Sequence, residues 1–140
     1  MEYDVFISFK NLLPNGESTR DSKLAREVHD YLVGRGLSVF FGNVSLESLG
    51  ISEYKKAIDV ALDVSQVLVA VGTTREHLEA RWVRYEWDSF FNDILSGVKP
   101  SGRVFAYVDG IRILDLPRSL RQAQTFIQGE DSDVRIMRQA

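Results

Sequence analysis

The stretch Val67-Leu68-Val69-Ala70-Val71 decides the fold class of this chain, because all five of its side chains are apolar. A strand that shows one face to water alternates apolar and polar residues, whereas a strand covered on both faces reads as a nearly continuous apolar run. The stretch therefore predicts a strand within a parallel sheet that has helices packed on both faces.

Short apolar runs alternate with amphipathic stretches on both sides of this strand. Further strands are expected at Tyr3–Phe9, Leu37–Phe41, Arg103–Val108 and Thr125–Gln128. Helices are expected at Ser22–Val33, from Ser52 (as N-cap) through Leu62, at Glu79–Leu95, at Pro117–Gln124 and from Ser132 onward. Strands that alternate with helices imply βαβ units with right-handed crossovers. We expect an α/β fold, a five-stranded parallel sheet with helices on both faces, in one domain over residues 1–140.

Composition limits the classes of partner. The net charge is −3 and no dense basic cluster is present, which argues against a nucleic-acid surface. The chain has no cysteine, so disulfides and thiolate metal sites are excluded, and His29 and His77 lie too far apart in sequence to suggest a metal site. The first residues have no signal-peptide pattern, and no apolar run approaches the roughly 18 residues that span a bilayer. We expect a cytoplasmic protein with no membrane segment and no metal.

Glu86 is the candidate catalytic residue. Four residues make just over one helical turn, so Trp82 and Glu86 share a helix face. The helical neighbours of Glu86 at three and four residues include no basic side chain; they are Trp82, Val83, Ser89 and Phe90. Burial between aromatic rings can tune the pKa of a carboxyl group for chemistry. The pattern alone leaves open a structural role, in which Glu86 is half exposed or pairs with a distant arginine.

Three loops converge at the carboxyl edge of the expected sheet, where parallel sheets bind ligands. They are 9–21, 42–52 and 72–81. The last one leads into the helix that carries Glu86, which places this glutamate near the expected ligand crevice. Loop 42–52 has several small polar residues and little apolar content, so we expect it to be mobile without ligand.

Five segments, in order, resemble the TIR (Toll/interleukin receptor) domain family, which has a flavodoxin-like fold. They are YDVFISF with Lys10-Asn11 (3–11), GLSVFFGNVSLESLGISEYKKAI (36–58), VLVAVGTT (67–74), RWVRYEW (81–87) and LPRSL (116–120). The resemblance covers Tyr3 to about Gln128. The fourth segment has the W-x-x-x-E spacing that carries the catalytic glutamate in TIR enzymes.

The resemblance implies an enzyme that cleaves the nicotinamide–ribose bond of NAD+, as a hydrolase or cyclase. NAD+ is then the substrate, and no cofactor is needed. Glu86 takes the catalytic role, with Trp82 as an apolar wall beside it. The family's substrate-binding positions fall on Phe9, Lys10, Gly50, Ser52 and Trp82. From the residues alone, Phe9 can equally be core, Lys10 a solvated lysine, Gly50 a turn residue and Ser52 a helix cap.

The family further implies a homo-oligomer formed through TIR–TIR contacts, activated by assembly and coupled to a fused or separate sensor domain in immune or antiphage defence. The expected final helix is short, so the domain is either truncated there or followed by another domain in a longer protein. The loop 42–52 lacks the Arg-Asp and Pro-Gly pairs of many receptor and adaptor members, and Lys10 replaces the arginine of many enzymatic ones.

The sequence leaves two other classes of function open. The first is a non-catalytic TIR module that signals by homotypic contact. The second is a receiver-like or other flavodoxin-type domain. The receiver is disfavoured because no acidic pair follows the first strand and no aspartate ends the strand at 67–71. Release of nicotinamide from NAD+ distinguishes an enzyme from both.

Overall fold

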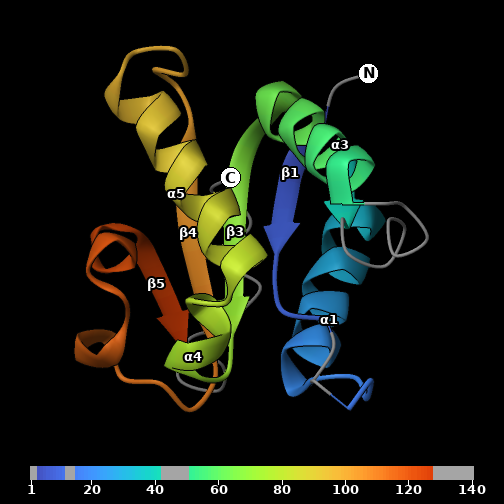
Figure 1. Ribbon diagram of the computed structural model, residues 1–140, viewed down its shortest axis with the longest axis vertical. Coiled ribbons are helices and arrows are strands. Elements are labelled where there is room, and N and C mark those ends of the chain that lie inside the picture. The colour runs from blue at the N-terminus through green and yellow to red at the C-terminus, as the bar shows by residue number, and fades with distance from the viewer. Residues whose placement is uncertain (1–2, 12–14, 42–50, 128–140) are drawn as a thin grey trace.

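Five parallel strands form a single sheet in the computed structural model, which describes residues 3–11, 15–41 and 51–127 (Figure 1). The strands are β1 (Tyr3–Ser8), β2 (Val39–Phe41), β3 (Ser65–Gly72), β4 (Arg103–Val108) and β5 (Gln124–Ile127). Their order across the sheet is β2-β1-β3-β4-β5, and every neighbouring pair is parallel. The α/β prediction of a five-stranded parallel sheet in a flavodoxin-like arrangement is therefore confirmed.

The helical segments follow the expected alternation with two differences. They are α1 (Arg20–Gly34), α3 (Ile51–Val64), α4 (Arg75–Leu78), α5 (Arg81–Leu95) and the 3-10 helices η1 (Ile113–Asp115) and η2 (Arg118–Gln122). The short α4 and η1 were not predicted. Ser52 was expected to cap α3 but lies in its first turn, because the helix already begins at Ile51. The final helix from Ser132 and most of the loop expected to be mobile lie outside the described residues.

Each face of the sheet has its own hydrophobic core. On one face, α1 contributes a stripe of buried side chains that packs against β1, β3 and β4; the stripe is Leu24, Ala25, Val28 and Leu32. On the other face, α3, α4 and α5 pack on the same strands through Ile58, Ala61, Leu62, Leu78, Val83, Trp87 and Phe90. Helices on both faces explain why residues 67–71 of β3 are all apolar, as the sequence indicated.

Strand alternation decides which core each side chain of β1 enters. Val5, Ile7 and Phe9 belong to the core under α1, and Phe6 belongs to the core under α5. Because side chains alternate along a strand, Ser8 points to the same face as Phe6. The last residue of β1 thus brings a hydroxyl group into the α5 side of the molecule.

All five strands point the same way, so their carboxyl ends form one edge, the lower one in Figure 1. The chain leaves β1 toward β2 on one side and leaves β3 toward β4 on the other. β1 and β3 are neighbours, so the topological switch point lies between them, where sheets of this kind bind ligands. Helix α4 and the first turn of α1 lie at this edge (Figure 1).

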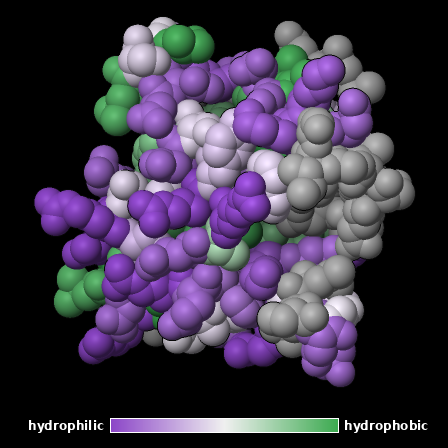
Figure 2. All heavy atoms as spheres, in the orientation of Figure 1, coloured by the Kyte–Doolittle hydropathy of each residue, from purple (hydrophilic) through white to green (hydrophobic). Residues whose placement is uncertain are grey.

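The face formed by α3 and α5 is mainly hydrophilic, with small hydrophobic patches at its margin (Figure 2). Large apolar side chains that are exposed include Leu95 at the end of α5, Val98 just after it, and Leu114 in η1. Within the described part of the chain, no helix is both long and apolar enough to cross a membrane.

Candidate active site

Glu86 lies in the second turn of α5 and is only 2% exposed. Helix residues three, four and seven positions apart share a face, and Val83, Glu86, Trp87 and Phe90 form the buried stripe of α5. Glu86 thus occupies a core position of its helix. The possibility that it is half exposed, left open by the sequence, is wrong for this structure.

The Ser8 hydroxyl is the hydrogen-bond donor to this carboxyl group. Ser8 Oγ lies 2.7 Å from Glu86 Oε1 and 3.4 Å from the carbonyl oxygen of Val83, and Ser8 is itself fully buried. The contact joins the carboxyl end of β1 to α5. The serine is one of the residues in the YDVFISF segment, although the sequence did not single it out.

Burial controls the protonation of Glu86. Loss of solvation raises its pKa to about 8 from the ordinary 4.5, and the hydrogen bond from Ser8 offsets only part of that rise. Among the described residues no cation forms an ion pair with Glu86. At neutral pH the group is therefore mainly a neutral acid. A cation that entered the site would favour the charged carboxylate.

Phe9 and Trp82, the two aromatic residues predicted to bind substrate, both lie outside the buried stripe of α5 that carries Glu86. Phe9 is completely buried in the core under α1, where its ring centroid is 4.8 Å from that of Phe41. The sheet thus separates Phe9 from Glu86. Trp82 is half-buried, packs edge-on against Tyr85 and has the guanidinium of Arg81 over its ring.

The buried tryptophan of α5 is Trp87, which the sequence did not single out. It is 2% exposed, and its indole Nε1 donates to the Leu78 carbonyl oxygen at 2.9 Å. Trp87 thereby ties α5 to α4. Trp82 and Trp87 lie five residues apart, on neighbouring stripes of the helix. Only tertiary packing reveals which of the two is the core anchor.

Lys10 is the one remaining predicted site residue whose side chain the structure describes. Lys10 is the second residue after β1. It is half-buried, and its carbonyl oxygen accepts a hydrogen bond from the Thr19 hydroxyl. Gly50 and the side chain of Ser52 lie outside the described part of the structure. The structure therefore brings Lys10 to the expected edge of the sheet, and the predicted roles of Gly50 and Ser52 stay predictions.

A second polar cluster, missed by the sequence interpretation, occupies the same edge. Asp21, in the first turn of α1, is fully buried and accepts a hydrogen bond from the Thr73 hydroxyl. Its Oδ1 also lies 3.0 Å from Nδ1 of His77, in α4. These residues are 52 and 56 positions apart in sequence, so no local spacing links them. The sequence signal that could have found this cluster was the expected convergence of loops 9–21 and 72–81 at one edge of the sheet.

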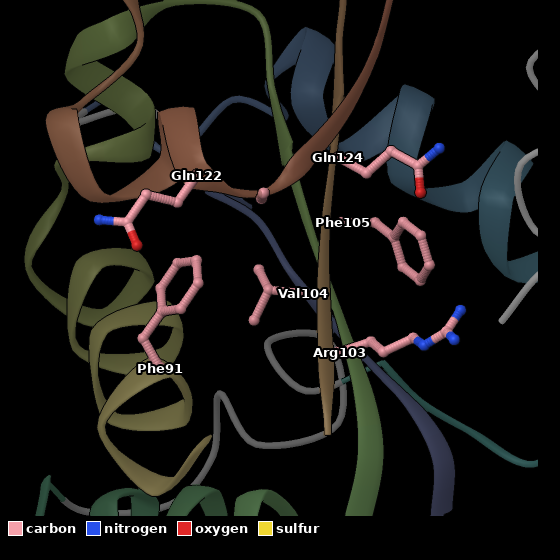
Figure 3. Close-up of a pocket in the computed structure, with 7 residues that line it drawn as sticks. Phe91, Arg103, Val104, Phe105, Gln122 and Gln124 are labelled. Carbon is pink, nitrogen blue, oxygen red and sulfur yellow. The ribbon is translucent and has the colours of Figure 1, made fainter. Parts of the chain in front are cut away.

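Two cavities lie away from this edge. One of about 400 Å³ opens between α5 and the first residues of β4 and β5, with Phe91, Val104 and Gln122 around it (Figure 3). The other, of about 530 Å³, lies beside α3, β1 and β2 and is lined by residues that include Tyr3, Phe40 and Lys56. Neither is lined by Glu86 or His77. Among the residues described, no three histidine or acidic side chains gather as a metal site would require.

No protein-family model matches the chain, and no curated protein matches it either.

Proposed function

We propose that this protein is a TIR-type enzyme that cleaves the nicotinamide–ribose bond of NAD+. The observation that carries the proposal is Glu86, a buried carboxyl group at the carboxyl end of β1 whose hydrogen bond comes from a neutral serine. Perturbed carboxyl groups in such positions are candidates for chemistry. The resemblance of RWVRYEW (81–87) to the TIR enzyme motif supplies the substrate.

This reaction can proceed with a single carboxylate. The nicotinamide ring of NAD+ is cationic and leaves as a neutral molecule when the bond between its nitrogen and the ribose carbon breaks. No general acid is needed, unlike the departure of an alcohol from a glycoside. Ionised Glu86 binds ribose hydroxyls and stabilises the positive charge that develops on the ribose.

The ionisation of Glu86 is coupled to substrate in this proposal. The empty site favours the neutral acid because the carboxyl group is buried. A pyridinium cation beside it favours loss of the proton, and the resulting carboxylate is present when the ribose becomes positive. Assembly with other copies through TIR–TIR contacts, under a fused or separate sensor domain, is the proposed means of opening the site in a cytoplasmic defence response.

The experiment is to incubate concentrated protein with NAD+ and separate the products by chromatography. Nicotinamide together with ADP-ribose identifies transfer to water, and nicotinamide with a cyclic nucleotide identifies attack by a group of the ligand itself. Absence of nicotinamide in every assembly state contradicts the proposal.

A non-catalytic TIR module that signals by homotypic contact is the second candidate. The burial of Glu86 within the apolar stripe of α5 favours it, because a neutral acid paired with Ser8 can serve as a purely structural contact. The same incubation separates the two candidates, since the module releases no nicotinamide.

A further inference from the structure

The cluster of Asp21, Thr73 and His77 has a feature that packing does not explain. Asp21 is fully buried, yet its Oδ2 has no hydrogen-bond partner among the described residues. Both of its bonds, from Thr73 and His77, fall on Oδ1. An unpaired buried carboxylate oxygen is costly, so its presence at the switch point of the sheet suggests a functional demand.

These contacts fix the form of the imidazole. An aspartate carboxylate only accepts hydrogen bonds, so Asp21 can pair with Nδ1 of His77 only as the acceptor. His77 must therefore donate through Nδ1–H, which leaves the lone pair of a neutral ring on Nε2. The His77 side chain is 20% exposed, whereas Asp21 is completely enclosed. The pair places a partly exposed imidazole at the carboxyl edge of the sheet, with a buried carboxylate behind it.

The two polar sites lie at the same edge but at different points of it. Ser8, which binds Glu86, is in register with Ala70 of β3, and Thr73 lies three residues further along the chain. Ser8 ends β1 and Thr73 directly follows β3, which is its neighbouring strand, so both polar sites lie at the carboxyl edge of the sheet.

We propose that His77 is a second catalytic residue, which removes the proton from the acceptor water, and that Asp21 is its positioning residue. The inference rests on the proposed cleavage of NAD+. After nicotinamide has left, the water oxygen forms the bond to the ribose carbon and one water proton passes to His77 Nε2. The products are nicotinamide and ADP-ribose, and the imidazolium returns its proton to solvent. Asp21 stabilises that imidazolium while it exists.

Comparison of two acceptors tests this role. Water must lose a proton as it attacks, whereas a free pyridine base attacks through a lone pair and loses none. His77→Gln should therefore lower the rate of ADP-ribose formation by about 10²-fold or more and leave exchange of labelled nicotinamide into NAD+ near the parent rate. Asp21→Asn should shift the ratio of hydrolysis to exchange in the same direction. Circular dichroism and thermal unfolding establish that each variant is folded.

His29 provides the matched control. Its side chain is 25% exposed and its Nδ1 lies 2.9 Å from Asp30. It sits on the third turn of α1, whereas Asp21 is in the first turn. His29→Gln should leave both rates unchanged. If hydrolysis and exchange fall together in folded His77→Gln, or neither falls, the role of His77 is wrong while cleavage of NAD+ stands. A parent that forms only a cyclic product also overturns this role. A parent that releases no nicotinamide overturns both proposals.

The tautomer gives a readout that is independent of activity. Nitrogen NMR of the parent protein should show the His77 proton on Nδ1 and an unprotonated Nε2. A proton on Nε2 of the neutral ring would overturn the inference whatever the protein does to NAD+.

Discussion

Glu86 holds a position of α5 that the helix otherwise gives to apolar side chains. Its neighbours in the buried stripe are Val83, Trp87 and Phe90, and its hydrogen bond comes from Ser8. A glutamine or leucine at this position would satisfy packing with less desolvation than a charged carboxylate. Retaining a titratable group here is destabilising at high pH, which is the pattern expected when chemistry, and not stability, requires the residue.

The pH dependence of stability tests the burial of Glu86. The carboxyl group keeps its proton up to about pH 8 in the folded chain but loses it near 4.5 when unfolded. Between these values the folded state binds one more proton, so the free energy of unfolding falls as pH rises, by about 1.4 kcal/mol per pH unit from this group. Glu86→Gln has no such proton. Its free energy of unfolding, relative to that of the parent, should therefore increase as the pH rises across that window.

Urea unfolding of both proteins at several pH values measures the difference. Contributions from other titrating groups are common to parent and variant, so they cancel in the comparison. A constant gap between the two curves from pH 5 to pH 8 would show that Glu86 is solvated in the folded protein.

At the scale of elements, Lys99 secures the end of α3. Its side chain is buried, and Nζ donates to the carbonyl oxygens of Asp63 and Ser65, each at 2.9 Å. These carbonyls lie where α3 passes into β3. Lys99→Met keeps the aliphatic stem and removes the donors, so we expect a loss of about 1.5–3 kcal/mol in the free energy of unfolding. Lys23→Met, at an exposed position of α1, is the control. Equal stability of the two variants would contradict the assignment.

Gly72 sets the distance between the end of β3 and α4. A Cβ atom at this position would lie 2.5 Å from Cγ of Leu78, which is fully buried. Gly72→Ala should therefore shift α4 and cost about 1–3 kcal/mol, and Leu78→Ala in the same chain should recover part of the additional loss. Gly34→Ala, where no atom lies within 4 Å of the added carbon, is the matched control. Additive effects of the two mutations, measured by thermal unfolding, would rule out the contact.

The elements were largely predictable because each carries a local pattern. The strand at Arg103–Val108 has the predicted bounds, and the apolar run at 67–71 lies within β3. The separate helix α4 was not predicted; Thr74 caps its start, and the Thr74 side chain accepts from the His77 amide. Glu86 stood out from its neighbours in sequence, but its hydrogen-bond donor is Ser8, 78 positions away.

For the whole molecule, the TIR resemblance predicts that activity depends on self-association. Because separate copies are expected to complete the site, specific activity should rise with protein concentration, in step with the oligomer fraction measured by light scattering. Activity per molecule that stays constant while the oligomer fraction increases would contradict this prediction. The alternative module would also associate, but without releasing nicotinamide.

We propose that the carboxylate of Glu86 cleaves NAD+. The most direct test compares nicotinamide release by the parent and by Glu86→Gln in the same assembly state. Removal of one preorganised electrostatic group of this kind costs about 10²–10³-fold in rate, so the variant should be slower by at least that factor. Glu53→Gln, an exposed change in the first turn of α3, should match the parent. A folded, assembled Glu86→Gln protein that releases nicotinamide as fast as the parent would contradict the account.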